Sequence, residues 1–78
     1  MEHRRPIKRS LTLRGHRTSV SLEDIFWDAF RSYAEADGET INGLAAKIDE
    51  ARGDLGLASA IRIFVLERAL GQQPHFLA

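Results

Sequence analysis

The sequence predicts a mostly α-helical domain with one β-strand near its N-terminus and three helices after the strand. Three observations predict this class: polar and apolar residues alternate over residues 17–22, helical spacing follows from Glu23, and glycines separate two further apolar stripes. With 78 residues the chain is one domain at most. We expect a flexible basic arm over residues 1–9, the strand and helices over residues 10–70, and a tail over residues 71–78.

The strand is predicted from the stretch SLTLRGHRTSVSL, in which apolar and polar side chains alternate on both sides of Gly15. Val20 and Leu22 share one face of its second half. The polar side chains of the opposite face are Arg17, Ser19 and Ser21. The first half either folds back as a hairpin at Arg14-Gly15-His16 or continues as one ribbon that kinks at the glycine, and the second half is the firmer strand.

Three helices are predicted from apolar residues spaced three and four apart. The first has Ser21 as its expected N-cap and stops at Gly38. The second covers residues 40–52, with Thr40 as its cap and Gly43 as a weak point in its first turn. The third covers residues 57–70 and is apolar on most faces, which indicates contact with a second subunit.

Charge is unevenly distributed, although the net charge is zero. Residues 1–18 hold six basic side chains and one acidic side chain, a net charge of +5, and the remaining 60 residues hold five basic and ten acidic ones. A basic end joined to an acidic body indicates either a polyanion-binding site at that end or a solvated, disordered tail.

A lone strand before helices leaves main-chain N–H and C=O groups unpaired along its edges. Because no second strong strand follows, we expect the same strand of another copy to pair with it, antiparallel, in a homodimer. A two-stranded ribbon fits the major groove of DNA, which is about 12 Å wide. There an arginine can bind guanine O6 and N7, and serine hydroxyls can bind several bases.

The sequence lacks the residue patterns that are typical of metal-binding proteins, enzymes and membrane proteins. The chain has no cysteine, and its three histidines do not have the spacing of metal ligands, so we expect no metal and no cofactor. It has no Ser/His/Asp set and no glycine-rich phosphate loop, so we expect no enzyme. It has no apolar run of about 18 residues and no secretory signal, so we expect a cytoplasmic protein without a membrane segment.

The strand and the segments LEDIFWDAFRSYAEADG and ETINGLAAKIDEA resemble the ribbon-helix-helix DNA-binding domains, the class of the Arc and MetJ repressors, over residues 17–51. The blocks KRSLTLRGHRTSVSLED and LASAIRIFVLE are similar to a group of short bacterial proteins with this domain, over most of residues 8–70. The resemblance implies an intertwined homodimer whose antiparallel two-stranded ribbon enters the major groove. The helix over residues 57–70 would be an addition to the usual two.

The resemblance also implies binding residues. The base-reading residues would be Arg17, Ser19 and Ser21. The N-terminus of the second helix would bind a DNA phosphate through Thr40, Ile41 and Asn42, as free N–H groups and the helix dipole favour anions there. We expect further phosphate contacts from Lys8, Arg9 and Arg14. If LASAIRIFVLERAL is instead the second helix of the family, the phosphate site moves to residues 57–59.

One feature opposes this site. The acidic residues close to it in sequence are Asp37, Glu39, Asp49 and Glu50, which would repel a phosphate unless they face away. The sequence predicts a small transcriptional regulator that binds double-stranded DNA as a homodimer or a higher assembly. The alternative is a protein-interaction module, of the antitoxin type, that docks a protein partner on its third helix.

Overall fold

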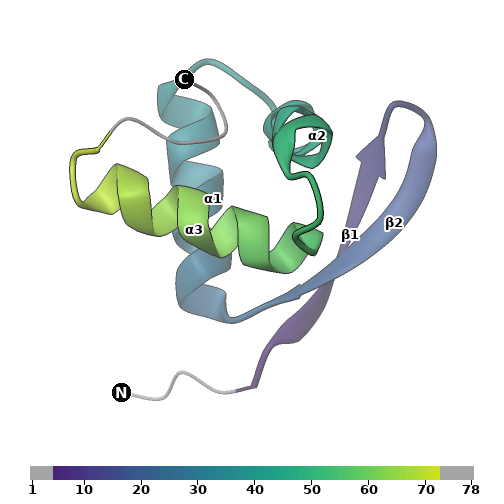
Figure 1. Cartoon of the computed structure of the whole chain (residues 1–78), viewed down its shortest axis with the longest axis horizontal. Coiled ribbons are helices and arrows are strands. Elements are labelled where there is room, and N and C mark those ends of the chain that lie inside the picture. Colours follow the sequence, from purple (N-terminus) through teal and green to yellow (C-terminus); the bar gives the residue numbers. More distant parts are fainter. Residues whose placement is uncertain (1–4, 73–78) are drawn as a thin grey trace.

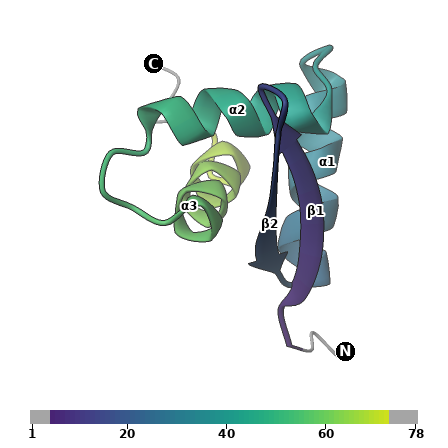
Figure 2. The ribbon, with the colours of Figure 1, turned by 90° about the vertical axis from the view of Figure 1, so that its right-hand side faces the viewer.

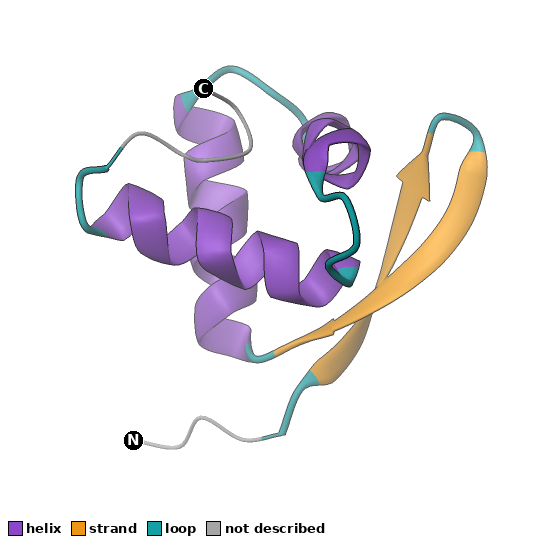
Figure 3. Ribbon diagram, in the orientation of Figure 1, coloured by secondary structure: helices purple, strands orange, loops and turns teal. Residues whose placement is uncertain are grey.

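The computed structural model describes residues 5–72, which form an antiparallel β-hairpin followed by three helices (Figure 1). The strands are β1 (Ile7–Leu13) and β2 (His16–Leu22), and the helices are α1 (Asp24–Ala36), α2 (Ile41–Ala51) and α3 (Leu57–Ala69). Figure 3 separates the orange hairpin from the purple helices. The predicted fold class, mostly helical with an N-terminal β element and a third helix, is confirmed.

The prediction of a single strand without a partner in its own chain is wrong. β1 pairs antiparallel with β2 along its whole length, from Ile7 opposite Leu22 to Leu13 opposite His16. The turn consists of Arg14 and Gly15, whose φ angles of 54° and 83° are both positive, as in a type I′ turn. Of the two arrangements that the sequence leaves open, the hairpin is therefore the one that forms.

The predicted arm over residues 1–9 is wrong for residues 7–9. β1 begins at Ile7, so residues 7–9 are part of the strand rather than of a flexible arm. The physical reason is Arg9, which occupies an inner-face position where alternation calls for an apolar residue. Its guanidinium lies 5.4 Å from the ring centroid of Trp27, forms an ion pair with Asp24, and donates to a main-chain carbonyl. Residues 1–4 of the predicted arm and residues 73–78 of the tail lie outside the described residues.

Helix α1 begins later than predicted and ends where predicted. Its N-cap is Glu23, and Ser21, the expected cap, still belongs to β2. At the other end Gly38 has a φ of 71°, and the N–H of Glu39 donates to the carbonyl of Ala34 at 2.9 Å. This is a Schellman motif, in which glycine is favoured because it adopts the left-handed conformation without strain.

Helix α2 begins at the predicted cap. The Thr40 Oγ1 accepts the N–H of Gly43 at 2.9 Å. A Cβ at position 43 would lie 2.9 Å from that same oxygen, which is closer than side-chain carbons approach an oxygen. The glycine that weakens the helix therefore makes room for the cap.

The core lies between the hairpin and the three helices (Figure 2). The rings of Phe30 in α1 and Phe64 in α3 meet edge to face at 6.1 Å. One face of α3 is buried, but Ile63, Leu66 and Leu70 stay exposed, at 38%, 56% and 62%. The expected burial of α3 on most faces is therefore not achieved within the described part of one chain. No helix in that part is long and apolar enough to cross a membrane.

Three arginines connect other elements to α1 in the same manner. Each pairs with a carboxylate at one end of α1 and lies over an aromatic ring of that helix. The sets are Arg9–Asp24–Trp27, Arg62–Glu23–Phe26 and Arg68–Asp37–Tyr33. Since Arg9 comes from β1 and the other two from α3, these contacts fix the hairpin and α3 against the same helix.

Candidate nucleic-acid interface

The hairpin has a polar face that points away from the helices, here called the outer face. The strand register places its residues opposite one another in three pairs: Lys8–Ser21, Ser10–Ser19 and Thr12–Arg17. All six side chains are exposed. The inner face carries Leu11, Val20 and Leu22, which are buried against the helices. Alternation along both strands therefore produces one continuous surface of hydroxyl groups and two cations.

The two cations of the outer face are free of carboxylates. All five basic residues of the helical region, and Arg9 and Arg14 of the hairpin, are in ion pairs. Within residues 5–72, Lys8 and Arg17 are in none. These two side chains therefore remain available to an anion or to a hydrogen-bond acceptor.

The structure places the predicted binding residues of the hairpin on its outer face, at its turn and on its inner side. Arg17, Ser19 and Ser21 lie together on the outer face, and Lys8 lies beside them opposite Ser21. Arg14 sits at the turn, more than half exposed, in an ion pair with Glu50 of α2. Arg9 points to the other side of the ribbon, where its side chain is only 17% exposed.

The N-terminus of α2 lies against the edge of β1. The Asn42 Oδ1 accepts the main-chain N–H of Thr12 at 3.0 Å. The first N–H groups of a helix have no partner within the helix. Because Thr40 takes that of Gly43, the N–H groups of Ile41 and Asn42 are those left at the helix end. This end has the groups for binding an anion, directly beside the ribbon.

The four acidic residues close to this helix end in sequence are paired with cations, whereas Glu35, which lines a hollow with Thr40 and Ile41, has no ion pair among residues 5–72. The pairs are Asp37–Arg68, Glu39–Lys47, Asp49–Arg52 and Glu50–Arg14. Hydrogen bonds from Arg68 lower the pKa of Asp37, so this carboxylate stays ionised and held in its pair. The repulsion of a phosphate that these four residues would cause is therefore largely offset.

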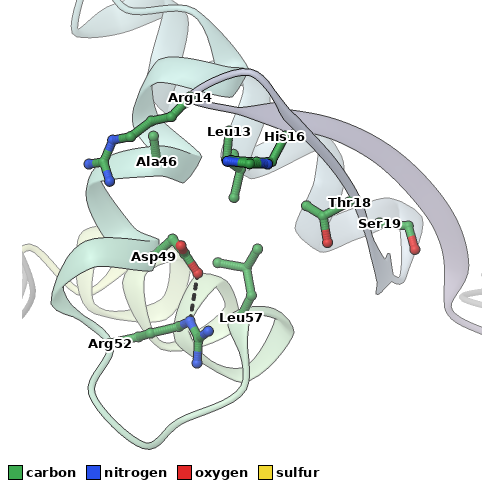
Figure 4. A pocket seen from close by; sticks show the side chains of 9 residues that line it. All are labelled: Leu13, Arg14, His16, Thr18, Ser19, Ala46, Asp49, Arg52 and Leu57. Carbon is green, nitrogen blue, oxygen red and sulfur yellow. Dashed lines mark hydrogen bonds and ion pairs between the residues drawn. The ribbon is translucent and has the colours of Figure 1, made fainter.

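The alternative phosphate site at residues 57–59 lies elsewhere. Gly56 caps α3 without a side-chain hydrogen bond, and the half-buried Leu57 faces a hollow of about 350 Å³ between the hairpin and α2 (Figure 4). Arg52 and Asp49 line this hollow and bind each other at 2.7 Å. Arg14, at its rim, pairs with Glu50. Two of its cations are thus already neutralised, which makes it a poor anion site.

The comparison with protein families decides the classification. The model of the ribbon-helix-helix domain matches residues 6–69. The chain belongs to the ribbon-helix-helix family. The match covers the hairpin and all three helices, so α3 is part of the matched domain. Ribbon-helix-helix domains are generally DNA-binding regulators that dimerise, and they are typically not enzymes. The comparisons with curated proteins and with solved structures give no significant match.

The sequence predictions missed two of the six residues of the outer face. Ser10 and Thr12 were not among the candidate site residues, because the first half of the alternating stretch had no settled structure. A signal for them exists: Leu11 and Leu13 alternate with Ser10 and Thr12, so inward leucines require outward hydroxyl groups. Only the pairing partner of β1 was needed to place them beside Arg17 and Ser19.

Proposed function

We propose that this ribbon-helix-helix protein binds double-stranded DNA sequence-specifically, with the outer face of its ribbon in the major groove, and acts as a small transcriptional regulator. The supporting observation is the unbroken polar outer face with its two unpaired cations. A two-stranded ribbon fits a groove about 12 Å wide. Arg17 would bind the O6 and N7 of a guanine, and Ser19 and Ser21 would bind neighbouring base edges.

Phosphate contacts would come from both sides of the ribbon. The N-terminus of α2, with Thr40, Ile41 and Asn42, would hold one phosphate at the β1 edge. Lys8, which is exposed and in no ion pair among residues 5–72, would contact another phosphate, and Arg14 would do so by exchanging its ion pair with Glu50 for a phosphate. Arg9 supports binding indirectly, as it holds β1 on α1 through Trp27 and Asp24. Phosphate contacts position the ribbon, and the base contacts supply the specificity.

We propose a homodimer as the binding unit, alone or in a higher assembly on DNA. Dimerisation is general in the family, and α3 offers exposed apolar side chains that a second subunit can cover. A regulator of this kind works where the DNA is, in the bacterial cytoplasm.

The test is a binding measurement on a duplex selected by the wild-type protein from a random library. Arg17→Ala should weaken binding by about 1–3 kcal/mol and relax the preference at one base pair. Arg31→Ala is the matched control for base preference: Arg31 lines a hollow beside Thr40 and Ile41, so its loss and the equal change in net charge affect all duplexes alike and should leave the preference at every base pair unchanged. Equal effects of the two substitutions would contradict a base-reading role for Arg17.

A second candidate function is protein binding on α3, of the antitoxin type. The observation that favours it is the row of exposed apolar side chains, Ile63, Leu66 and Leu70. Leu66→Lys separates the two candidates. If the protein only binds DNA, Leu66→Lys should weaken the dimer and lower the DNA affinity with it. If α3 docks a protein partner, Leu66→Lys should keep the DNA affinity and lose the binding of that partner.

A further inference from the structure

We infer that one chain carries a complete groove-reading ribbon, so that β1 reads bases together with β2. The inference adds Ser10 of β1 to the residues that determine which base pairs the protein prefers. The inference rests on the proposed DNA binding and departs from the expected ribbon, in which each of two chains contributes one strand.

The first support is the strand register. Ser10 lies directly opposite Ser19 on the outer face, and both side chains are exposed. The N–H of Thr12 and the carbonyl of Ser21 turn away from the partner strand, to Asn42 and to Arg62. The outer-face pairs are therefore the non-hydrogen-bonded ones, in which Cα atoms approach to about 4.5 Å. A base edge that meets Ser19 lies within reach of Ser10.

The second support is the state of the two strand edges. The Arg62 Nη2 of α3 donates to the carbonyl of Ser21 at 3.2 Å, so α3 covers one end of the outer edge of β2. A β2 strand of another chain, paired there, would have to share this carbonyl with Arg62 of α3. Asn42 covers the edge of β1 at Thr12. One edge group of each strand is therefore hydrogen-bonded to a helix of the same chain. This favours a ribbon that consists of the two strands of one hairpin.

The third support is width. Strands lie about 4.8 Å apart, so two hairpins joined through β2 would form a sheet about 14 Å across from first to last strand. That exceeds the major groove, which is about 12 Å wide, before side chains are added. One hairpin fits the groove. The N-terminus of α2, hydrogen-bonded to the edge of β1, then lies where the phosphates flank the groove.

The experiment measures dissociation constants of the full chain on the selected duplex and on all its single-base-pair variants. The proteins are the wild type, Ser10→Ala, Ser19→Ala and the control Ser32→Ala, which removes an exposed hydroxyl from α1. We expect Ser10→Ala to change the preference at a base pair by roughly three- to tenfold, the worth of one hydrogen bond. Ser19→Ala should do so as well, and Ser32→Ala should not.

Two results would overturn the inference, and they differ. If Ser19→Ala changes the base preference and Ser10→Ala leaves it unchanged or weakens all duplexes equally, β1 lies outside the groove and the DNA-binding function stands. If the wild type itself shows no preference among duplexes, the proposed function fails as well. Circular dichroism verifies folding, and Ser10→Val, which also removes the hydroxyl and favours a strand, gives a second variant if Ser10→Ala unfolds.

Discussion

The side-chain oxygen of Asn42, in the first turn of α2, accepts the main-chain N–H of Thr12 in β1 at 3.0 Å. This contact joins the element proposed to read bases to the helix end proposed to bind phosphate. It also pairs an edge N–H that the ribbon itself cannot satisfy. Asn42 therefore has a structural role that is separable from the phosphate contact proposed for it.

Replacement of Asn42 separates the two roles. Asn42→Ala removes the acceptor and should lower the free energy of unfolding by about 0.5–1.5 kcal/mol. Asn42→Asp keeps an acceptor and places a negative charge at a helix N-terminus, so the stability should change by less than about 0.5 kcal/mol. The same charge beside a phosphate should weaken DNA binding by about 1 kcal/mol or more.

Denaturant unfolding and DNA titration of both variants measure these effects. The decisive variant is Asn42→Asp, which should be stable and weak in binding. If it binds the selected duplex as tightly as the wild type, the N-terminus of α2 does not meet the DNA backbone.

Gly43 tests the link between the cap and the helix. Gly43→Ala should gain about 1 kcal/mol of helix propensity and lose a similar amount, because its Cβ displaces the Thr40 hydroxyl from the cap. The net change in stability should therefore be close to zero. In a Thr40→Ala background no cap remains to be lost, and the same substitution should stabilise by about 1 kcal/mol. Equal gains in both backgrounds would show that the cap and the glycine are independent.

Val20 tests the inner face of the ribbon. Its side chain is 5% exposed, so Val20→Asp buries a carboxylate without a partner and should destabilise by more than about 3 kcal/mol, enough to unfold a small domain. Ser19→Asp, one residue earlier on the outer face, should change stability by about 0.5 kcal/mol or less. Thermal unfolding followed by circular dichroism compares them, and a folded Val20→Asp protein would place Val20 outside the core.

Acid should destabilise the fold through the arginine–carboxylate pairs of α1. A hydrogen bond from its own main-chain N–H, and then those from Arg62, lower the pKa of Glu23 below 4.5; hydrogen bonds from Arg68 lower the pKa of Asp37 below 3.8. A lowered pKa in the folded state stabilises above the ordinary value, and the gain is lost as the pH falls through the folded value. We expect the unfolding temperature to fall between about pH 5 and pH 3.

The matched comparison uses a double variant, Glu23→Gln with Asp37→Asn. It should be less stable at neutral pH and less sensitive to acid than the wild type. Asp54→Asn is the control, because Asp54 is an exposed carboxylate outside every ion pair among residues 5–72. If the double variant follows the wild type through the whole range, these two pairs do not cause the acid sensitivity.

The helices and the polar face of β2 could be predicted from the sequence, because each depends on local spacing. The stripe that contains Phe26, Phe30 and Tyr33, the Thr40 cap and the Gly38 stop are local signals, as is the outward direction of Arg17. The start of α1 was misplaced because Ser21 is a good cap by type but lies in a paired strand.

β1 was harder to predict from the sequence, because the charged residue Arg9 occupies a position on its inner face. Alternation counts Arg9 as polar, whereas the structure covers it with Trp27 and Asp24, residues 18 and 15 positions later. The turn lacks the common Asn-Gly or Asp-Gly signal and places Arg14 in the left-handed region instead. The pairing of Asp37 with Arg68 and of Glu50 with Arg14 likewise depends on tertiary contacts that a linear charge pattern does not contain, whereas Asp49 and Arg52 form a local pair three residues apart.

The most direct test of the central claim, that the outer face of the ribbon binds DNA, is a titration of isotope-labelled protein with the selected duplex, followed by amide chemical shifts. The largest shifts should fall on Lys8, Ser10, Thr12, Arg17, Ser19 and Ser21, with a second group at Ile41 and Asn42. Shifts confined to α3, or none at duplex concentrations that saturate a specific site, would contradict it.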